Sequence, residues 1–199
     1  GLANNTAYTC TIEVQNASGY GATSTASNST TTNNVPGAPT GVTSSAPTTS
    51  QMTVSWTAPA SNGGASITSY TVTSSPGSQT CTWTAGVSGA TLTCDVSGLS
   101  ANTSYTFTVT ATNTNGTSSA SSASSSAATL PGTVAAPTAT GGNKSVSVAF
   151  STYSAGNATV TGYRATCGGF SNTGTTSPIV VSGLANNTAY TCTIEVQNA

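Results

Sequence analysis

Alternation of apolar and small polar residues runs through most of the chain and predicts β-strands. Near the N-terminus, Tyr8, Cys10, Ile12 and Val14 alternate with polar residues. A period of two places the apolar set on a buried face and the polar set in solvent. Similar runs recur at intervals of roughly 8–12 residues, separated by turn signals. The pattern predicts an all-β chain of sandwiches with about seven strands each.

Two proline-containing breaks divide the chain. Pro36 and Pro39 interrupt the alternation, and Pro131-Gly132 interrupts it again. Such breaks are typical of domain junctions. The first predicted domain supplies the last strands of a preceding module, the second is a complete module, and the third lacks its last strand. These domains are residues 1–35, 36–131 and 132–199. The Ser/Thr-rich stretches 22–34 and 117–130 are predicted to be polar edge strands.

The chain begins and ends with the same seventeen residues. Residues 1–17 and 183–199 both read GLANNTAYTCTIEVQNA, at an offset of 182 residues. A fixed period is typical of repeat proteins. We therefore expect a window on a longer array, in which Gly1 and Ala199 are not native termini. The next copy of residues 18–35 would then close the last module and cover its open hydrogen-bonding edge.

The second and third predicted domains share aromatic positions and one longer run. Trp56 has Phe150 as its counterpart, and Tyr70 has Tyr163. The runs are Gly98-Leu99-x5-Tyr105-x-Phe107-x-Val109-x-Ala111 and Gly183-Leu184-x5-Tyr190-x-Cys192-x-Ile194-x-Val196. In these residues both modules resemble bacterial fibronectin type III domains. The resemblance implies immunoglobulin-like sandwiches in which the Leu and Tyr build a tyrosine corner. No RGD tripeptide occurs, so the integrin binding of some animal members is not implied.

The five cysteines predict two disulfides and one unpaired residue. Cys167 and Cys192 lie inward on strands that neighbour each other in type III sheets. Cys81 and Cys94 flank a twelve-residue loop that a disulfide can close. Each bridge contributes about 3 kcal/mol by the chain-entropy estimate, and disulfides imply an oxidising compartment. Cys10, the repeat of Cys192, has no partner within this window. A metal site or reactive thiol is the alternative, but the chain has no His and no CxxC spacing.

Charge is nearly absent, with two basic residues, three acidic residues and no His. Nucleic-acid binding needs clustered Lys and Arg, and electrostatic membrane binding needs a basic patch. With only two basic residues, the sequence argues against both kinds of binding. No apolar run reaches the ~20 residues of a membrane span. Glu13, Asp95 and Glu195 are isolated and predicted to face solvent, and no His is present to activate a hydroxyl. The sequence predicts no catalytic site, no cofactor and no metal.

Aromatic and polar residues supply the remaining candidate sites. Trp83 and Tyr20 could stack on a sugar, although Trp83 could equally cover the edge of the sandwich. A Ser/Thr-rich strand at residues 117–129 could carry O-glycans. Eight Asn-x-Ser/Thr sequons are candidate N-glycan acceptors, or chance matches in a chain rich in these residues. They begin at Asn4, Asn16, Asn28, Asn102, Asn115, Asn143, Asn157 and Asn186.

Together these features predict an extracellular structural array that serves as a filament, stalk or adhesin shaft. Short junctions with proline act as semi-rigid spacers, and stacked modules behave as a rod. The expected partners are adjacent repeats of the same chain, with lateral self-association and glycans left open. The alternative is a carbohydrate-binding or spacer module accessory to a secreted polysaccharide-active enzyme. A strip of exposed aromatic residues would favour the alternative, whereas isolated aromatic residues favour the shaft.

Overall fold

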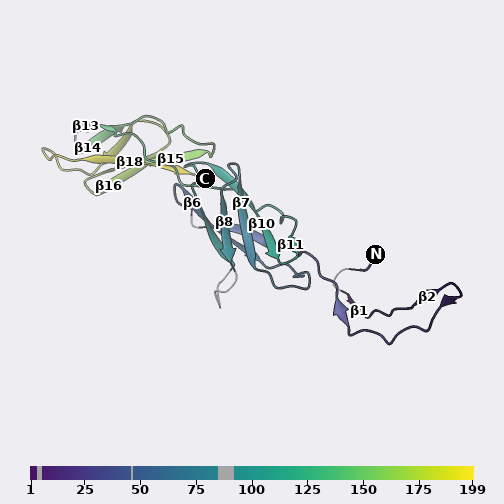
Figure 1. Ribbon diagram of the computed structural model, residues 1–199. Helices are drawn as coiled ribbons and strands as arrows, with labels where there is room; N and C mark the ends of the chain where they lie inside the picture. The colour runs from purple at the N-terminus through teal and green to yellow at the C-terminus, as the bar shows by residue number, and fades with distance from the viewer. Residues whose placement is uncertain (4–5, 46, 85–91) are drawn as a thin grey trace.

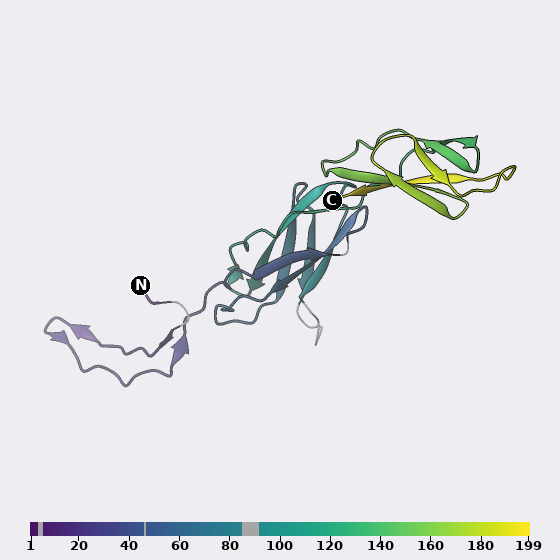
Figure 2. The ribbon, with the colours of Figure 1, turned by 180° about the vertical axis from the view of Figure 1, so that it is seen from behind.

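The computed structural model describes residues 1–3, 6–45, 47–84 and 92–199. Every regular element in these residues is a β-strand, so the all-β prediction is confirmed. Figures 1 and 2 show an N-terminal hairpin followed by two sandwiches, arranged one after another along the chain.

The first sandwich consists of two antiparallel sheets. One sheet has the order β5-β6-β9, and the other has the order β11-β10-β7-β8 with β12 also paired to β10. The strands are β5 (Thr40–Ser45), β6 (Gln51–Thr57), β7 (Ser69–Ser75), β8 (Thr80–Thr84), β9 (Thr93–Ser97), β10 (Ser104–Asn113), β11 (Gly116–Thr117) and β12 (Ala127–Ala128).

Alternate residues of these strands form the core between the sheets. Met52, Val54 and Trp56 of β6 are buried and pack with Phe107 and Val109 of β10. The residues between them are more exposed, as the period of two predicts. Burial of large apolar side chains in this core supplies most of the stabilisation of a sandwich of this size.

The second sandwich has the same strand order in a shorter form. Its sheets are β13-β14-β17 and β16-β15-β18. The strands are β13 (Thr138–Gly142), β14 (Ser145–Ala149), β15 (Val160–Cys167), β16 (Phe170–Gly174), β17 (Ile179–Ser182) and β18 (Cys192–Asn198). Val148, Val181 and Ala165 are fully buried, and Ile194 of β18 packs on them. Within the described chain β18 pairs only with β15, so it forms the edge of its sheet.

Residues 6–35 form a long hairpin with short paired segments. These are β1 (Ala7–Tyr8), β2 (Gln15–Asn16), β3 (Gly19–Tyr20) and β4 (Thr30–Thr31). β1 pairs with β4, and β2 pairs with β3. The prediction that Cys10, Ile12 and Val14 are buried is wrong for this copy of the repeat. Ile12 is 70% exposed and Val14 is 76% exposed, because no second sheet among the described residues packs against them.

The tyrosine corner implied by the family resemblance is confirmed in all three parts of the chain. In each case the tyrosine hydroxyl accepts a hydrogen bond from the main-chain amide five residues earlier. The pairs are Tyr8 with Ala3 at 2.8 Å, Tyr105 with Ser100 at 2.9 Å, and Tyr190 with Ala185 at 3.1 Å. The corner therefore forms even in the hairpin, where no sandwich surrounds it.

Candidate functional site

Asn102 lies at the centre of the junction between the two sandwiches. Its side chain is 2% exposed, and its Nδ2 donates hydrogen bonds to the carbonyl oxygens of Ala155 (2.8 Å) and Ala158 (3.0 Å). Its Oδ1 accepts a bond from Nδ2 of Asn198 (2.9 Å), and its carbonyl oxygen accepts bonds from the amides of Asn157 and Ala158. One buried side chain of the first sandwich thus binds a loop and the last strand of the second.

Two further hydrogen bonds strengthen this junction. Nδ2 of Asn198 also donates to the carbonyl oxygen of Thr129, at 2.8 Å. The amide of Gly132 donates to the Tyr153 hydroxyl, also at 2.8 Å. Both bonds join the end of the first sandwich or its linker to the second sandwich, so the linker is not the only connection between them.

Asn113 makes the corresponding contact at the first junction. It ends β10 just as Asn198 closes β18, and it is 4% exposed. Its Nδ2 donates to the carbonyl oxygens of Asn34 (2.9 Å) and Asn62 (2.8 Å). Asn34 precedes the first sandwich, whereas Asn62 lies in the loop between β6 and β7. The same residue type at the same place therefore joins each sandwich to the segment before it.

A glycine allows the close approach at each junction. Gly63 has a φ of +72° and Gly156 has a φ of +81°. A Cβ on either residue would lie 2.1 Å from a carbonyl oxygen of the preceding segment, that of Asn34 or of Asn102. Both the backbone conformation and the lack of space exclude a side chain there.

The sequence analysis did not predict a site at Asn113, Asn198, Gly63 or Gly156, and it predicted Asn102 only as a candidate glycan acceptor. Aligning the tyrosine-corner runs of the two modules places Asn113 opposite Asn198, and the 182-residue repeat adds Asn16. Aligning Tyr70 with Tyr163 places Gly63 opposite Gly156. A residue-by-residue alignment of the two modules was therefore the signal that could have found them.

A serine ladder, formed by Ser118, Ser121 and Ser124, holds the last segment of the first sandwich against β10. The amide of Ser121 donates to the carbonyl oxygen of Val109 (2.9 Å), and the Val109 amide donates back to Oγ of Ser121 (3.0 Å). Ser118 does the same with Ala111, and Ser124 with Phe107.

The serine ladder corrects the prediction of regular edge strands. Residues 118–126 are not a β-strand. Each serine and its pair of hydrogen bonds form one rung of the ladder, and the rungs come at every third residue, which is the period of a polyproline II helix. The hydroxyl oxygen accepts the hydrogen bond that a main-chain carbonyl accepts in an ordinary ladder. Residues 21–29 of the N-terminal hairpin lack strand structure for the same reason.

The N-terminal hairpin contains the same device. The amide of Ser24 donates to the carbonyl oxygen of Ile12 (2.9 Å), and the Ile12 amide donates to Oγ of Ser24 (3.0 Å). Ser27 makes the same pair of bonds with Cys10, at 2.8 and 3.0 Å. These two rungs extend the serine ladder to a second place in the chain.

Both expected cysteine pairs are disulfide-bonded in the structure. Cys81 on β8 is bonded to Cys94 on β9 and joins the two sheets of the first sandwich. Cys167 on β15 is bonded to Cys192, its direct neighbour on β18. Cys10 is free and exposed.

The candidate glycan acceptors fall into three groups. Asn4 lies outside the described residues. Asn102 is corrected, because its Nδ2 is buried and bonded across the junction and is therefore closed to a glycan in this arrangement. The remaining acceptors have exposed side chains; they are Asn16, Asn28, Asn115, Asn143, Asn157 and Asn186.

The two candidate stacking aromatics lie apart. Trp83 is half-buried against the core, with its ring edge-on to Tyr70 at a centroid distance of 5.5 Å. Tyr20, on β3 of the hairpin, is 68% exposed. Burial also raises the pKa of the Tyr70 hydroxyl. Trp83 thus serves as part of the core, and the structure assembles no aromatic strip from these residues.

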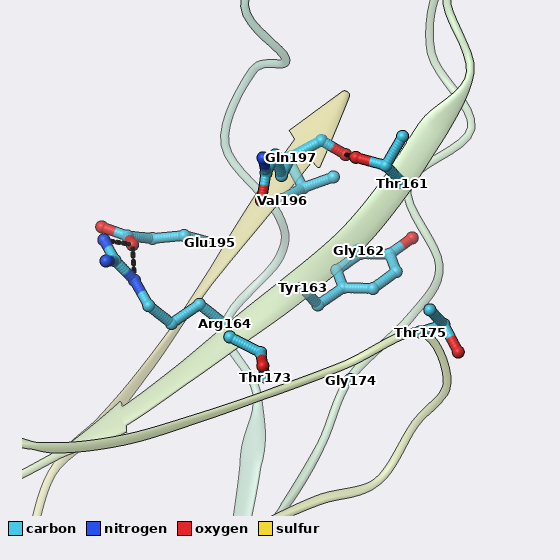
Figure 3. A pocket seen from close by; sticks show the side chains of 10 residues that line it. All are labelled: Thr161, Gly162, Tyr163, Arg164, Thr173, Gly174, Thr175, Glu195, Val196 and Gln197. Carbon is cyan, nitrogen blue, oxygen red and sulfur yellow. Dashed lines mark hydrogen bonds and ion pairs between the residues drawn. The ribbon is translucent and has the colours of Figure 1, made fainter. Parts of the chain in front are cut away.

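A hollow of about 570 Å³ lies on the sheet of β15, β16 and β18. Figure 3 shows Arg164 and Glu195 paired at one side of this hollow with Thr173 beside Arg164, and Thr161 and Thr175 at the other side. The ion pair is well over half exposed, so its contribution to stability is small. The Thr161 hydroxyl donates to the carbonyl oxygen of Gln197, and Glu195, the carboxylate of this lining, is paired with Arg164.

Metal-ligand clusters and membrane-spanning helices are both absent from the described residues. In that part of the chain no three His, Cys, Asp or Glu side chains come together as metal ligands. The same residues include no helix with the length and hydropathy needed to cross a bilayer.

Facing antiparallel sheets with tyrosine corners define an immunoglobulin-like β-sandwich protein, a class of modules that are typically non-catalytic. Residues 37–127, which include the strands of the first sandwich up to β11, match the family described as Fibronectin type III domain. Over 116 residues the chain is 40% identical to Chitinase A1 of Niallia circulans. That match covers 54% of this chain and 15% of the chitinase.

Solved structures of titin are similar over about half of the chain. Domains A168-A170 from titin are 31% identical, with a TM-score of 0.42, over 52% of this chain and 36% of that one. Titin kinase and its flanking domains are 33% identical, with a TM-score of 0.40, over 48% of this chain and 17% of that one.

Proposed function

We propose that the chain is part of an extracellular structural array in which type III sandwiches lie end to end as a semi-rigid shaft or spacer. The observation that carries this proposal is the repeated junction contact. Asn113 and Asn198 end equivalent strands, and each donates a hydrogen bond to one main-chain carbonyl oxygen of the preceding segment, that of Asn34 or of Thr129. Hydrogen bonds outside the linker restrict rotation of one module against the next, and a chain of such modules is a rod.

The disulfides and the low charge support an extracellular structural role. Stable disulfides persist in oxidising compartments. Two basic and three acidic residues give little repulsion between neighbouring shafts, which leaves lateral self-association open. The partners proposed are therefore adjacent repeats first and parallel shafts second.

Similarity to a chitinase favours a second candidate function, a spacer accessory to a polysaccharide-active enzyme. A spacer of this kind also needs modules held in fixed orientations. The two candidate functions therefore share the same rigid junctions and differ in the domains that the modules connect. A module that itself binds carbohydrate needs exposed aromatic platforms. Tyr20 is the strongest single candidate for one, since Trp83 packs against the core.

Small-angle X-ray scattering of the chain tests the end-to-end arrangement. We expect an elongated particle whose maximum dimension does not change with concentration. Gly156→Ala should broaden the distribution of dimensions, because its Cβ would collide with the Asn102 carbonyl oxygen. Gly169→Ala is the matched control, since Gly169 has a similar φ of +88° but nothing within 4 Å of its Cβ. A compact globule would contradict the proposal.

Binding to insoluble chitin separates the two candidate functions. A shaft or a passive spacer should remain in the supernatant after sedimentation with chitin. Retention on chitin that is lost in Tyr20→Ala, and kept in Tyr8→Phe, would instead make the hairpin a carbohydrate-binding surface.

A further inference from the structure

The outer edge of β18 presents main-chain N–H and C=O groups. In the first sandwich, the equivalent groups of β10 form hydrogen bonds with the serine ladder. In register with β15, Ile194 lies opposite Ala165, just as Val109 of β10 lies opposite Val72. The Val109 amide points away from β7 and bonds to Ser121. The equivalent amide of Ile194 therefore points away from β15, towards the open edge.

A segment that fits this edge is already visible in the same chain. Cys10 and Ile12 are the repeats of Cys192 and Ile194, and in the hairpin they bond to Ser27 and Ser24. The identity of residues 1–17 and 183–199 means that β18 presents the same sequence to a partner.

The hairpin also reproduces the register of the complete sandwich. Pairing of Tyr8 with Thr30 corresponds to pairing of Tyr105 with Ala127, and Gln15 with Tyr20 corresponds to β10 with β11. The segment thus approaches its strand in the same way whether or not a sandwich lies beneath it. Its geometry is set by the serine rungs rather than by the core.

We propose that the edge of β18 binds a second copy of residues 18–32, which closes the sandwich through serine rungs to Cys192 and Ile194. The occupant is defined by its spacing, Gly21-x-x-Ser24-x-x-Ser27, which corresponds to Ser118, Ser121 and Ser124 of the first sandwich. The proposal rests on the proposed array, because the copy belongs to a neighbouring repeat. It adds the surface, the segment and the bonds through which neighbours join.

The edge of β18 leaves space for this segment. A hollow of about 540 Å³ runs beside β18 and the linker, lined by Leu130, Val134, Ile194 and Val196 among others. At the first junction, the turn between β10 and β11 fills the corresponding region, where a Cβ on Gly116 would lie 3.0 Å from Val35. The hollow is therefore the place where the turn of the second copy would lie.

Glu195 provides a further contact for the second copy. In the hairpin the hydroxyl of Thr23 donates to the carboxylate of Glu13, the repeat of Glu195. Glu195 accepts bonds from Arg164 through Oε2 only, and its side chain is 59% exposed. Its remaining acceptor capacity suits the Thr23 hydroxyl of the added segment.

Hydrogen exchange in an extended chain tests the proposal. Residues 18–35 are appended after Ala199, which recreates the order found after Ala17. The amides of Cys192 and Ile194 should then exchange at least about tenfold more slowly than in the original chain. The Val196 amide should gain less, because its partner in the repeat is Gly21, which has no hydroxyl.

Alanine at the serine positions supplies the control. The appended copy carrying Ser24→Ala and Ser27→Ala keeps length and composition but has no Oγ acceptors. We expect the protection of Cys192 and Ile194 to fall back towards the original rates. Unchanged rates in the extended chain, or equal protection by the alanine copy, would overturn the proposal.

This experiment is independent of the proposed function. Exchange at β18 reports on one edge within one chain and does not depend on how rigid the junction is. A flexible junction in scattering would contradict the shaft and leave the exchange result intact. If the amides of Cys192 and Ile194 gain no protection, the proposed pairing of the second copy with β18 is refuted. The proposed elongated shaft would not be affected by that result.

Discussion

The same seventeen residues occupy two different environments in this molecule. At the N-terminal end Ile12 is 70% exposed, and at the C-terminal end its repeat Ile194 is 9% exposed. Cys10 is free, whereas Cys192 is bonded to Cys167. The sequence is identical, so the differences come entirely from what lies beside and beneath the strand.

Each copy of the repeated strand has one of its two edges paired. The N-terminal copy has the serine ladder on one side, through Ser24 and Ser27, and no sheet on the other. The C-terminal copy has β15 on one side and an open edge on the other. The comparison shows that the serine ladder forms without a core, and that the core forms without the serine ladder.

Removing the disulfide should give the largest difference between the two copies. The double change Cys167→Ser and Cys192→Ser removes a disulfide between residues 25 positions apart. The free energy of unfolding of the second sandwich should fall by about 3.5 kcal/mol. Cys10→Ser removes no bond and should leave stability unchanged. NMR peak intensities of amides in the second sandwich, followed through a guanidinium titration, measure both. Equal effects of the two changes would contradict the assignment of Cys10 as the unpaired copy.

The repeated isoleucine, Ile12 in one copy and Ile194 in the other, should give the next largest difference in stability. Ile194→Ala removes a buried side chain and should destabilise the second sandwich by about 3 kcal/mol. Ile12→Ala alters an exposed residue and should change stability by less than about 0.5 kcal/mol. The same NMR titration applies. A substantial loss in Ile12→Ala would show that the hairpin packs on a surface that the structure leaves open.

A serine rung should have an intermediate effect. Ser121→Ala leaves the buried Val109 amide without its acceptor and should cost the first sandwich about 1–2 kcal/mol. Ser24→Ala, in the exposed hairpin, should cost a few tenths of a kcal/mol because water replaces the lost acceptor. Both tryptophans, Trp56 and Trp83, lie in the first sandwich, so tryptophan fluorescence follows its unfolding. No loss in Ser121→Ala would argue that the rungs are dispensable.

The junction asparagine should have the smallest effect on stability. Asn198→Ala removes two hydrogen bonds to the first sandwich and should cost about 1 kcal/mol. Asn16→Ala, its repeat, alters an exposed turn in which Oδ1 accepts a bond from the Ser18 amide, and should cost less. Calorimetry of the two variants measures this difference, and a larger loss in Asn16→Ala would contradict it.

Much of the fold follows from local patterns. The period of two located the strands that carry Met52, Val54, Phe107 and Val109, because burial between two sheets requires that alternation. The tyrosine corner was implied by the resemblance to type III domains, which rests in part on the run from Leu99 to Tyr105 and its counterpart in the second module. These features depend on residues close together in sequence or repeated in both modules.

The junctions and the serine ladder could not be predicted from a period of two. Ser118, Ser121 and Ser124 lie among many other Ser and Ala residues, so their period of three does not stand out. Asn102 reads as a surface sequon, yet contacts with Ala155 and Ala158 bury it. The contacts of Asn102 with Ala155 and Ala158 join residues more than fifty positions apart, which no local pattern encodes.

The central claim is that contacts around Asn102 hold the two sandwiches in one relative orientation. Residual dipolar couplings measured for both sandwiches in the same weakly aligned sample test it most directly. The structure predicts that a single alignment tensor fits residues 36–131 and 132–199 together, and that Gly156→Ala separates it into two. Two different tensors in the unaltered chain would mean that the sandwiches reorient independently, and would contradict the account.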